Sequence, residues 1–341
     1  PPFREDPYAV PCASCHQAAS VHNDTCEDCS ARDAFGAKSP TGKDASTPEL
    51  ISLERLSAHC GQQLELAKDL GTLARLPLDR TKRNHLATIY ADGNSVGQLF
   101  ASVSDTTAAI ALSGAIEEAI QEAGDRALAE LVPLSEPGTM PGIVTVLAAD
   151  DALITVPAAF GWTFALTLTK TFNERMLNDD RVTRAMEFGG HRPTLSAGIA
   201  FTHVKSPIEV AIQTADAAMR QAKRTKPGES AIGWADLTHP GDPSSLCALT
   251  WLTDNIAVVE SISGMPASQR ASWERDIVSG RETHVPERDI LAFLRREVRR
   301  LSSIDLALDG LTLDDILKLI SMSRWCPAKE ATRPRSSEEA S

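Results

Sequence analysis

Four cysteines near the start of the sequence have the spacing of a metal site. They form two C-x-x-C pairs separated by ten residues: Cys12, Cys15, Cys26 and Cys29. Each pair can present two thiolates to one ion, and four thiolates complete a closed tetrahedral Zn²⁺ site that leaves no position for water. The spacing therefore predicts a structural zinc module in residues 1–35. Metal binding would fold this segment, which is too short to build a core of its own.

Disulfides or a redox pair are the alternatives to zinc for these cysteines. The sequence has seven cysteines, and its first residues lack the apolar core of a signal peptide. An odd number of cysteines without an export signal argues against a disulfide framework. His16 and His22 lie inside the motif. Either could replace a thiolate, but we favour the interpretation that both are solvated loop residues.

Three aspartates form a second group that could do chemistry. Asp92 follows the apolar segment 86–91, and Asp150 and Asp151 separate two further apolar segments. If these carboxylates converge, they repel one another unless a divalent cation binds them. Mg²⁺ or Mn²⁺ bound by carboxylates and substrate phosphates is the usual arrangement at nucleotide sites. Each aspartate taken alone could also be an ordinary turn residue.

Residues that could bind phosphate lie beside these aspartates. Gly93 and Gly97 flank the predicted start of a helix, where small residues let backbone N–H groups approach a phosphate. Lys223, at the end of an alanine-rich helix, could reach the same phosphates.

The predicted elements bring the aspartates together. Apolar runs and helical periodicity predict strand 86–91, helix 96–131 with a break near Asp105, strands 143–148 and 152–156, helix 158–177, strand 194–201, helix 207–223 and strand 230–237. This order is the split β-α-β pattern of a ferredoxin-like domain. In such a sheet, the tip of the hairpin lies beside the end of the first strand.

The rest of the sequence divides into three regions around a ferredoxin-like palm at residues 86–237. Residues 36–85 contain a linker and a helix that begins at Thr47, with apolar residues at helical spacing as far as Leu73. Residues 244–325 form a helical domain, with helices expected near 246–263, 267–279, 286–301 and 311–322. Residues 326–341 form a polar tail that we expect to be disordered. The predicted fold class is therefore α+β.

Composition excludes several classes of protein. With 34 basic and 46 acidic residues, the net charge is −12. Such a chain is a poor candidate for non-specific DNA binding, which depends on many basic contacts to phosphate. No apolar run reaches the ~18 residues that span a membrane. We expect a cytoplasmic protein without a membrane partner.

Four segments taken together resemble a known family: YADGNSVG, LAADDALITVPA, LSAGIAFTHVKSPI and DAAMRQAK. They resemble the second palm domain of the large, polymerase-like subunit of type III CRISPR effector complexes. That palm is related to GGDEF diguanylate cyclases and to class III nucleotide cyclases. The preceding zinc-ribbon module and the following helical domain match the order in that subunit. The resemblance covers roughly residues 10–325 and rests on the order of the motifs, since no single motif is decisive.

The resemblance implies a nucleotidyltransferase of antiviral defence, which makes cyclic oligoadenylate from ATP with Mg²⁺ or Mn²⁺ when target RNA is bound. It implies that Asp92 and Asp150 are metal ligands and catalytic residues, with Asp151 a second ligand or a neighbour. It places the triphosphate against Gly93, Asn94, Gly97 and Lys223, and it places Ser196 near the base. The nucleotide-binding residues that it implies are Gly93, Asn94, Gly97, Ala149, Ser196 and Lys223.

The sequence departs from the family in two respects. The family's Gly-Gly before the two aspartates is Ala148-Ala149 here. Two added methyl groups could crowd ATP while leaving the metal site intact, so a catalytically degenerate nucleotide-binding or scaffold subunit is an alternative. A diguanylate-cyclase-like signalling protein that uses GTP is another. The family's nuclease domain and first palm are also missing from this sequence. The sequence could be a fragment of a longer chain; a palm alone would need a homodimer or a separate first-palm chain. The resemblance also implies other type III subunits with guide RNA and target RNA as partners.

Overall fold

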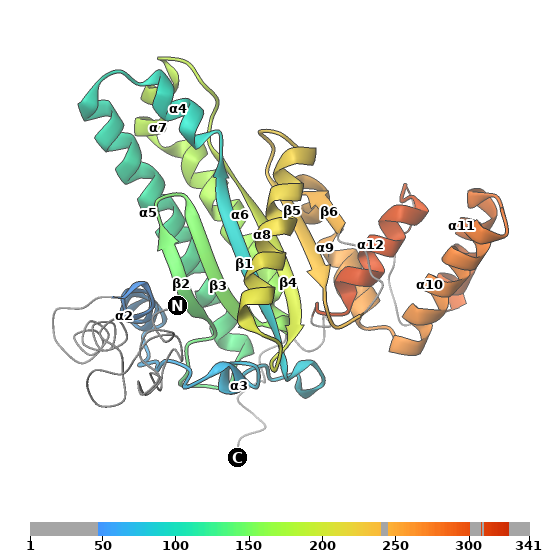
Figure 1. Ribbon diagram of the computed structural model, residues 1–341. Helices are drawn as coiled ribbons and strands as arrows, with labels where there is room; N and C mark the ends of the chain where they lie inside the picture. The colour runs from blue at the N-terminus through green and yellow to red at the C-terminus, as the bar shows by residue number, and fades with distance from the viewer. Residues whose placement is uncertain (1–46, 240–244, 301–307, 309, 327–341) are drawn as a thin grey trace, which may run out of the picture. The chain divides into compact units, whose positions relative to one another are not determined.

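The computed structural model describes residues 47–239, 245–300, 308 and 310–326 (Figure 1). The four cysteines of the predicted zinc module lie outside the described residues, as do His16 and His22. The chain divides into two compact units, Pro1–Glu54 and Arg55–Ser341. Thr47 begins helix α2 (Pro48–Cys60) as predicted, because its Oγ1 accepts a hydrogen bond of 3.3 Å from the backbone N–H of Leu50.

The helix at the start of the described chain is shorter than predicted. Gly61 follows α2 with φ at +64°, in the left-handed region that ends helices. The chain then runs to a short second helix, α3 (Leu70–Leu73), and to the 3₁₀ turn η2 (Arg80–Lys82). The leucines at helical spacing therefore belong to two helices rather than to one.

The described residues contain one sheet of six strands, in the order β2-β3-β1-β4-β5-β6. Neighbouring strands are antiparallel, except that β4 and β5 are parallel. The first four strands, with helices after β1 and β3, form the split β-α-β-β-α-β arrangement that the sequence predicts. The strands are β1 (His85–Asn94), β2 (Ile143–Ala148), β3 (Asp151–Pro157), β4 (Thr194–His203), β5 (Ala231–Asp236) and β6 (Ser245–Ala248).

Helices cover both faces of this sheet. The helices on the sheet are α5 (Thr106–Leu131), α6 (Gly161–Asn178) and α8 (Ile208–Thr225). The shorter helices α4 (Val96–Ser102) and α7 (Asp180–Met186) contact each other, and the 3₁₀ turns are η3 (Val132–Leu134) and η4 (Ala158–Phe160). The predicted break between α4 and α5 is confirmed at Asp105, whose carboxylate accepts hydrogen bonds from the backbone N–H groups of Thr107 and Ala108. The two long helices α5 and α6 pack together, and α6 and α8 both contact β1 and β4. In Figure 1, α8 crosses in front of the sheet.

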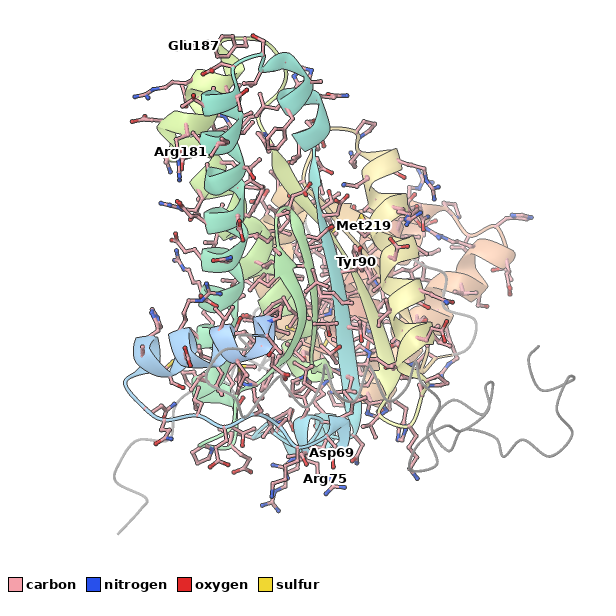
Figure 2. The ribbon with its side chains drawn as sticks, turned by 60° about the vertical axis from the view of Figure 1, so that its left-hand side comes forward. Asp69, Arg75, Tyr90, Arg181, Glu187 and Met219 are labelled. Atoms are coloured by element: carbon pink, nitrogen blue, oxygen red, sulfur yellow. The ribbon has the colours of Figure 1, made fainter. Side chains whose placement is uncertain are left out.

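The sheet allows α8 to approach unusually closely. A Cβ atom on Gly198 of β4 would lie 2.0 Å from the carbonyl oxygen of Ala215 and 2.4 Å from the backbone nitrogen of Met219. Gly233 of β5 meets α8 in the same way. Figure 2 marks Met219 on α8 beside Tyr90 of β1, the residue that pairs with Gly198. Backbone contact with two glycines therefore fixes the position of α8.

Four further helices follow the sheet, close to their predicted positions: α9 (Leu249–Ser263), α10 (Ala267–Glu282), α11 (Glu287–Arg300) and α12 (Leu313–Ser323). Strand β6 includes the first residues of the helix that the sequence predicted near 246–263, so helix α9 begins three residues later than expected. No helix of the described segments has the length and the apolar character that crossing a membrane requires.

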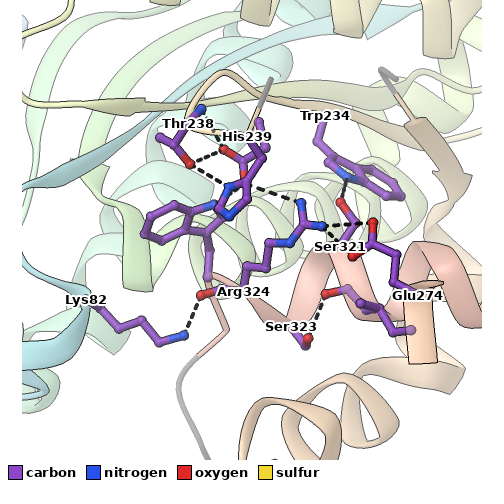
Figure 3. A network of polar contacts seen from close by, with 11 residues as sticks. Lys82, Trp234, Thr238, His239, Glu274, Ser321, Ser323 and Arg324 are labelled. Carbon is purple, nitrogen blue, oxygen red and sulfur yellow. Dashed lines mark hydrogen bonds and ion pairs between the residues drawn. The ribbon is translucent and has the colours of Figure 1, made fainter. Parts of the chain in front are cut away.

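The C-terminal helices are tied to strand β5 by hydrogen bonds (Figure 3). The indole N–H of Trp325 donates to the carboxylate of Asp236 at 2.8 Å, and that of Trp234 donates to Ser321 Oγ at 3.3 Å. Arg324 donates to both carboxylate oxygens of Glu274 on α10. The end of the described chain is thus anchored on a strand of the palm sheet.

Candidate metal and nucleotide site

Asp92 lies near the end of the central strand β1. Its Cα atom is opposite Asp151 on β3 and opposite Ser196 on β4. The strand continues to Asn94, three residues beyond the predicted segment 86–91. Asp92 is therefore inside the strand rather than after it, and pairing on both sides fixes its backbone. Because alternate residues share a face, Asp92 lies on the same face as Tyr90, the face that α8 covers.

The β2–β3 hairpin brings the other two aspartates to this point. Ala148 pairs with Asp151, so Ala149 and Asp150 form a two-residue loop. The backbone N–H of Gly93 donates a hydrogen bond of 3.1 Å to the carbonyl oxygen of Asp150. One carboxylate oxygen from each of Asp92, Asp150 and Asp151 lies within 4.8 Å of the other two. The structure thus brings together the three aspartates that the sequence singled out.

The electrostatics of this cluster suit a divalent cation. Burial raises the pKa of Asp150, and the neighbouring charge of Asp151 raises it further. Burial also raises the pKa of Asp151. Burial and the repulsion between the two carboxylates both disfavour the charged forms, and a bound cation would stabilise those forms. Since three carboxylates are the hard oxygen ligands that Mg²⁺ and Mn²⁺ prefer, the donor set fits either ion.

Lys223 is also part of this cluster. It lies in the last turn of α8, and its ammonium group contacts Asp92 Oδ2 and donates a hydrogen bond of 2.8 Å to the carbonyl oxygen of Gly93. Burial lowers the pKa of Lys223 to about 8. The sequence suggested that this lysine reaches phosphates, but it gave no sign of a contact with Asp92.

The two glycines expected at the phosphates have different surroundings. A Cβ atom on Gly93 would lie 2.8 Å from Asp150 Oδ2 and 2.6 Å from a methyl carbon of Val96. Gly93 is therefore required for the close approach of Asp150 to β1. Gly97 is exposed in the first turn of α4, and a Cβ atom there would meet no atom within 4 Å. Only Gly97 thus faces open space that a phosphate could fill.

The alanine that replaces the family's second glycine keeps a glycine-like backbone. Ala149 has φ at +54°, whereas Asp150 is not among the described residues with positive φ. Positive φ at only the first central residue is the pattern of a type II′ hairpin turn, which favours glycine at that position. Ala149 therefore adopts a turn conformation that favours glycine, at the cost of backbone strain.

Asn94 and Ser196 lie inside the protein, away from the expected nucleotide surface. The side-chain amide of Asn94 donates to Ser196 Oγ and Thr194 Oγ1 at 2.9 Å and to the carbonyl oxygen of Glu229 at 3.1 Å. Asn94 is 6% exposed and Ser196 is fully buried. Ser196 Oγ also accepts a hydrogen bond from the backbone N–H of Ala231. These residues join β1, β4 and the start of β5, so their geometry is that of a structural cluster rather than of a base-binding surface.

Residues 85–232 match the family model of the second palm domain of Cas10/Cmr2. This segment belongs to that family. The second palm domain runs from the first residue of β1 into β5, so it contains the whole aspartate cluster and Lys223. Curated proteins provide no match to the sequence.

Two solved structures share their fold with about three quarters of this chain. Csm1 from T. onnurineus is 15% identical, with a TM-score of 0.50 over 75% of this chain and 39% of Csm1. A chain of the Csm1–Csm4 cassette in complex with cA4 is 13% identical, with a TM-score of 0.51 over 74% of this chain and 38% of that chain. The GGEEF domain of a diguanylate cyclase from Vibrio cholerae is 12% identical, with a TM-score of 0.32 over 45% of this chain and 85% of that domain. The sequence therefore spans less than two fifths of either Csm1 neighbour.

Proposed function

We propose that this chain binds ATP with Mg²⁺ or Mn²⁺ at Asp92, Asp150 and Asp151, and that it makes cyclic oligoadenylate in a type III CRISPR effector complex. The convergence of these three carboxylates to within 4.8 Å, inside a Cas10/Cmr2 second palm domain, carries the proposal. A neighbour of the same fold, the Csm1–Csm4 cassette, has been solved in complex with cA4, which is in keeping with this reaction.

Each residue of the site would have a separate role in such a reaction. A ribose hydroxyl of one ATP loses its proton to water and bonds to the α-phosphorus of another ATP, whose bond to pyrophosphate breaks. The divalent ion supplies positive charge that lowers the pKa of the hydroxyl and stabilises the leaving pyrophosphate. Asp92 and Asp150 would hold that ion, and the open space beside Gly97 would receive phosphate oxygens. Lys223 is within the site to bind the triphosphate.

A second palm must complete the reaction, because joining two nucleotides requires two of them to meet. That second palm would hold the other ATP. Further type III subunits, with guide RNA and target RNA, would form the rest of the assembly. The zinc module proposed for Cys12, Cys15, Cys26 and Cys29 would be structural.

The first test is an assay of the purified chain with labelled ATP and Mn²⁺, followed by separation of the products. Asp150→Asn removes a metal-binding charge with little change in size, so we expect loss of product by at least about a hundredfold. The control, Asp314→Asn, removes the same charge from an α12 residue whose side chain is 70% exposed, and it should leave product formation unchanged. Equal product from wild type and Asp150→Asn would overturn the assignment.

A nucleotide-binding scaffold without catalysis is the second candidate. The methyl groups of Ala148 and Ala149 are exposed at the tip of the hairpin, beside the aspartates. Calorimetry with ATP and Mg²⁺ distinguishes the two candidates. Tight binding without product, together with product from the Ala148→Gly, Ala149→Gly double variant, would favour the scaffold.

A further inference from the structure

Lys223 and a divalent ion would need the same carboxylate. The ammonium group of Lys223 contacts Asp92 Oδ2 and donates to the carbonyl oxygen of Gly93. The side chains of Lys223 and Asp92 are only 22% and 31% exposed, so water screens this ion pair less than it screens a surface pair. Asp92 is also one of the three carboxylates that could hold a metal ion.

We propose that Lys223 is the internal cation of the metal-free site, and that a divalent ion binds by displacing it from Asp92. This inference rests on the proposed metal site. An ammonium group and a divalent ion on one carboxylate would lie a few ångströms apart, where like charges repel strongly in a partly buried setting. The two cations therefore exclude each other from Asp92.

The exchange requires movement of one side chain only. Asp92 is held in the central strand by pairing with β3 and β4. The backbone of α8 is held by its contacts with Gly198 and Gly233. The lysine side chain between these two fixed backbones has four flexible methylene groups, so it can leave Asp92 while both elements stay in place. A triphosphate that enters with the metal offers the released ammonium group a new anionic partner.

The experiment measures the affinity of the full chain for Mn²⁺ without nucleotide, from the electron paramagnetic resonance signal of free Mn²⁺. Lys223→Met and Lys223→Gln both remove the competing charge, and two variants guard against a folding defect in one. We expect each to bind Mn²⁺ about fivefold more tightly than wild type, the factor that loss of a modest ion pair gives. Lys223→Arg keeps the positive charge and should stay near the wild-type affinity.

Lys226→Met is the matched control. Lys226 is the residue that follows α8, and within the described part of the chain it forms no ion pair with Asp92, Asp150 or Asp151. This control tests whether the loss of any nearby positive charge increases Mn²⁺ affinity. Equal gains at positions 223 and 226 would overturn the proposal, as would unchanged or weaker Mn²⁺ binding by both Lys223 variants.

The same variants separate this inference from the proposed function. Tighter Mn²⁺ binding by the Lys223 variants supports the exchange even if the wild type binds no ATP. Absence of ATP binding by the wild type would contradict only the proposed function. If the wild type binds ATP with Mn²⁺ and the Lys223 variants show unchanged Mn²⁺ affinity, the exchange fails and the proposed function stands. Absence of Mn²⁺ binding in all variants contradicts both.

Discussion

Ala149 stands where the family has a glycine, and the effect of this difference can be measured as a change in the free energy of unfolding. An L-residue in the left-handed region costs about 1–2 kcal/mol, and glycine avoids this cost while losing more chain entropy on folding. We therefore expect Ala149→Gly to increase the free energy of unfolding by about 0.5–1 kcal/mol. Urea unfolding followed by circular dichroism measures the change.

Ala148 is the control for this prediction, because it lies in strand β2 and is not among the described residues with positive φ. Ala148→Gly should decrease the free energy of unfolding by about 0.5 kcal/mol, since glycine only adds chain entropy there. A gain of stability at position 148 equal to that at position 149 would contradict the argument from φ.

Single residues were predictable from the sequence where the order of strands determines their position. The three aspartates follow from the split β-α-β pattern alone, because it places the hairpin tip beside the first strand. Asn94 and Ser196 were expected at the nucleotide by resemblance, and only the structure reveals their burial. The contact of Lys223 with Asp92 depends on how closely α8 approaches the sheet, which sequence periodicity does not report.

At the scale of elements, the bond between Trp325 and Asp236 anchors the end of the described chain on β5. The Asp236 side chain is 2% exposed, and the loss of a hydrogen bond to a buried charge costs about 1.5–3 kcal/mol. Trp325→Phe should therefore lower the free energy of unfolding by this amount. The smaller phenyl ring also loses packing contacts, which lowers it further. Guanidinium unfolding, followed by near-ultraviolet circular dichroism, provides the measurement.

Trp273 supplies a control that loses packing only. It is fully buried in α10, and its indole nitrogen has no hydrogen-bond partner among the described residues. We expect Trp325→Phe to destabilise the protein by about 1–2 kcal/mol more than Trp273→Phe does. Equal losses would show that the bond to Asp236 adds nothing to packing.

Most elements were predictable because they are long and strongly patterned. The helices of the palm and of the C-terminal region, and the β2–β3 hairpin, carry clear periodicity over many residues. The exceptions have physical reasons. Strand β6 has four residues and α7 has seven, too few for a periodic signal. The extra residues of β1 are polar and glycine-rich, so their strand conformation comes from pairing with β3 and β4 and not from their own propensity.

At the scale of the whole molecule, thiol reactivity tests the predicted zinc module within the intact chain. Of seven cysteines, Cys247 and Cys326 are buried, and burial raises the pKa of each thiol to about 12. Cys60 is only partly buried. Because the thiolate is the reactive form, Ellman's reagent should titrate one thiol in the zinc-loaded native protein.

Removal of metal and then unfolding should release the remaining thiols in two steps. A chelator should free four, if Cys12, Cys15, Cys26 and Cys29 bind zinc, and guanidinium should free the last two. Cys60→Ser should abolish the first titratable thiol and leave both later steps unchanged. Five reactive thiols before addition of a chelator would contradict the zinc module.

The strand pairing of Asp92 has a consequence for local unfolding and amide exchange in the protein. Its strand is hydrogen-bonded on both sides, whereas Ala149 and Asp150 are at the tip of a hairpin whose other strand, β2, is the edge of the sheet. Backbone amides in a central strand exchange with solvent only on global unfolding, while those at an edge hairpin exchange through local opening. An ion bound by both Asp92 and Asp150 would therefore link the hairpin tip, which opens locally, to strand β1, which opens only on global unfolding. Its binding energy would appear as slower amide exchange at the hairpin tip, with β1 unchanged.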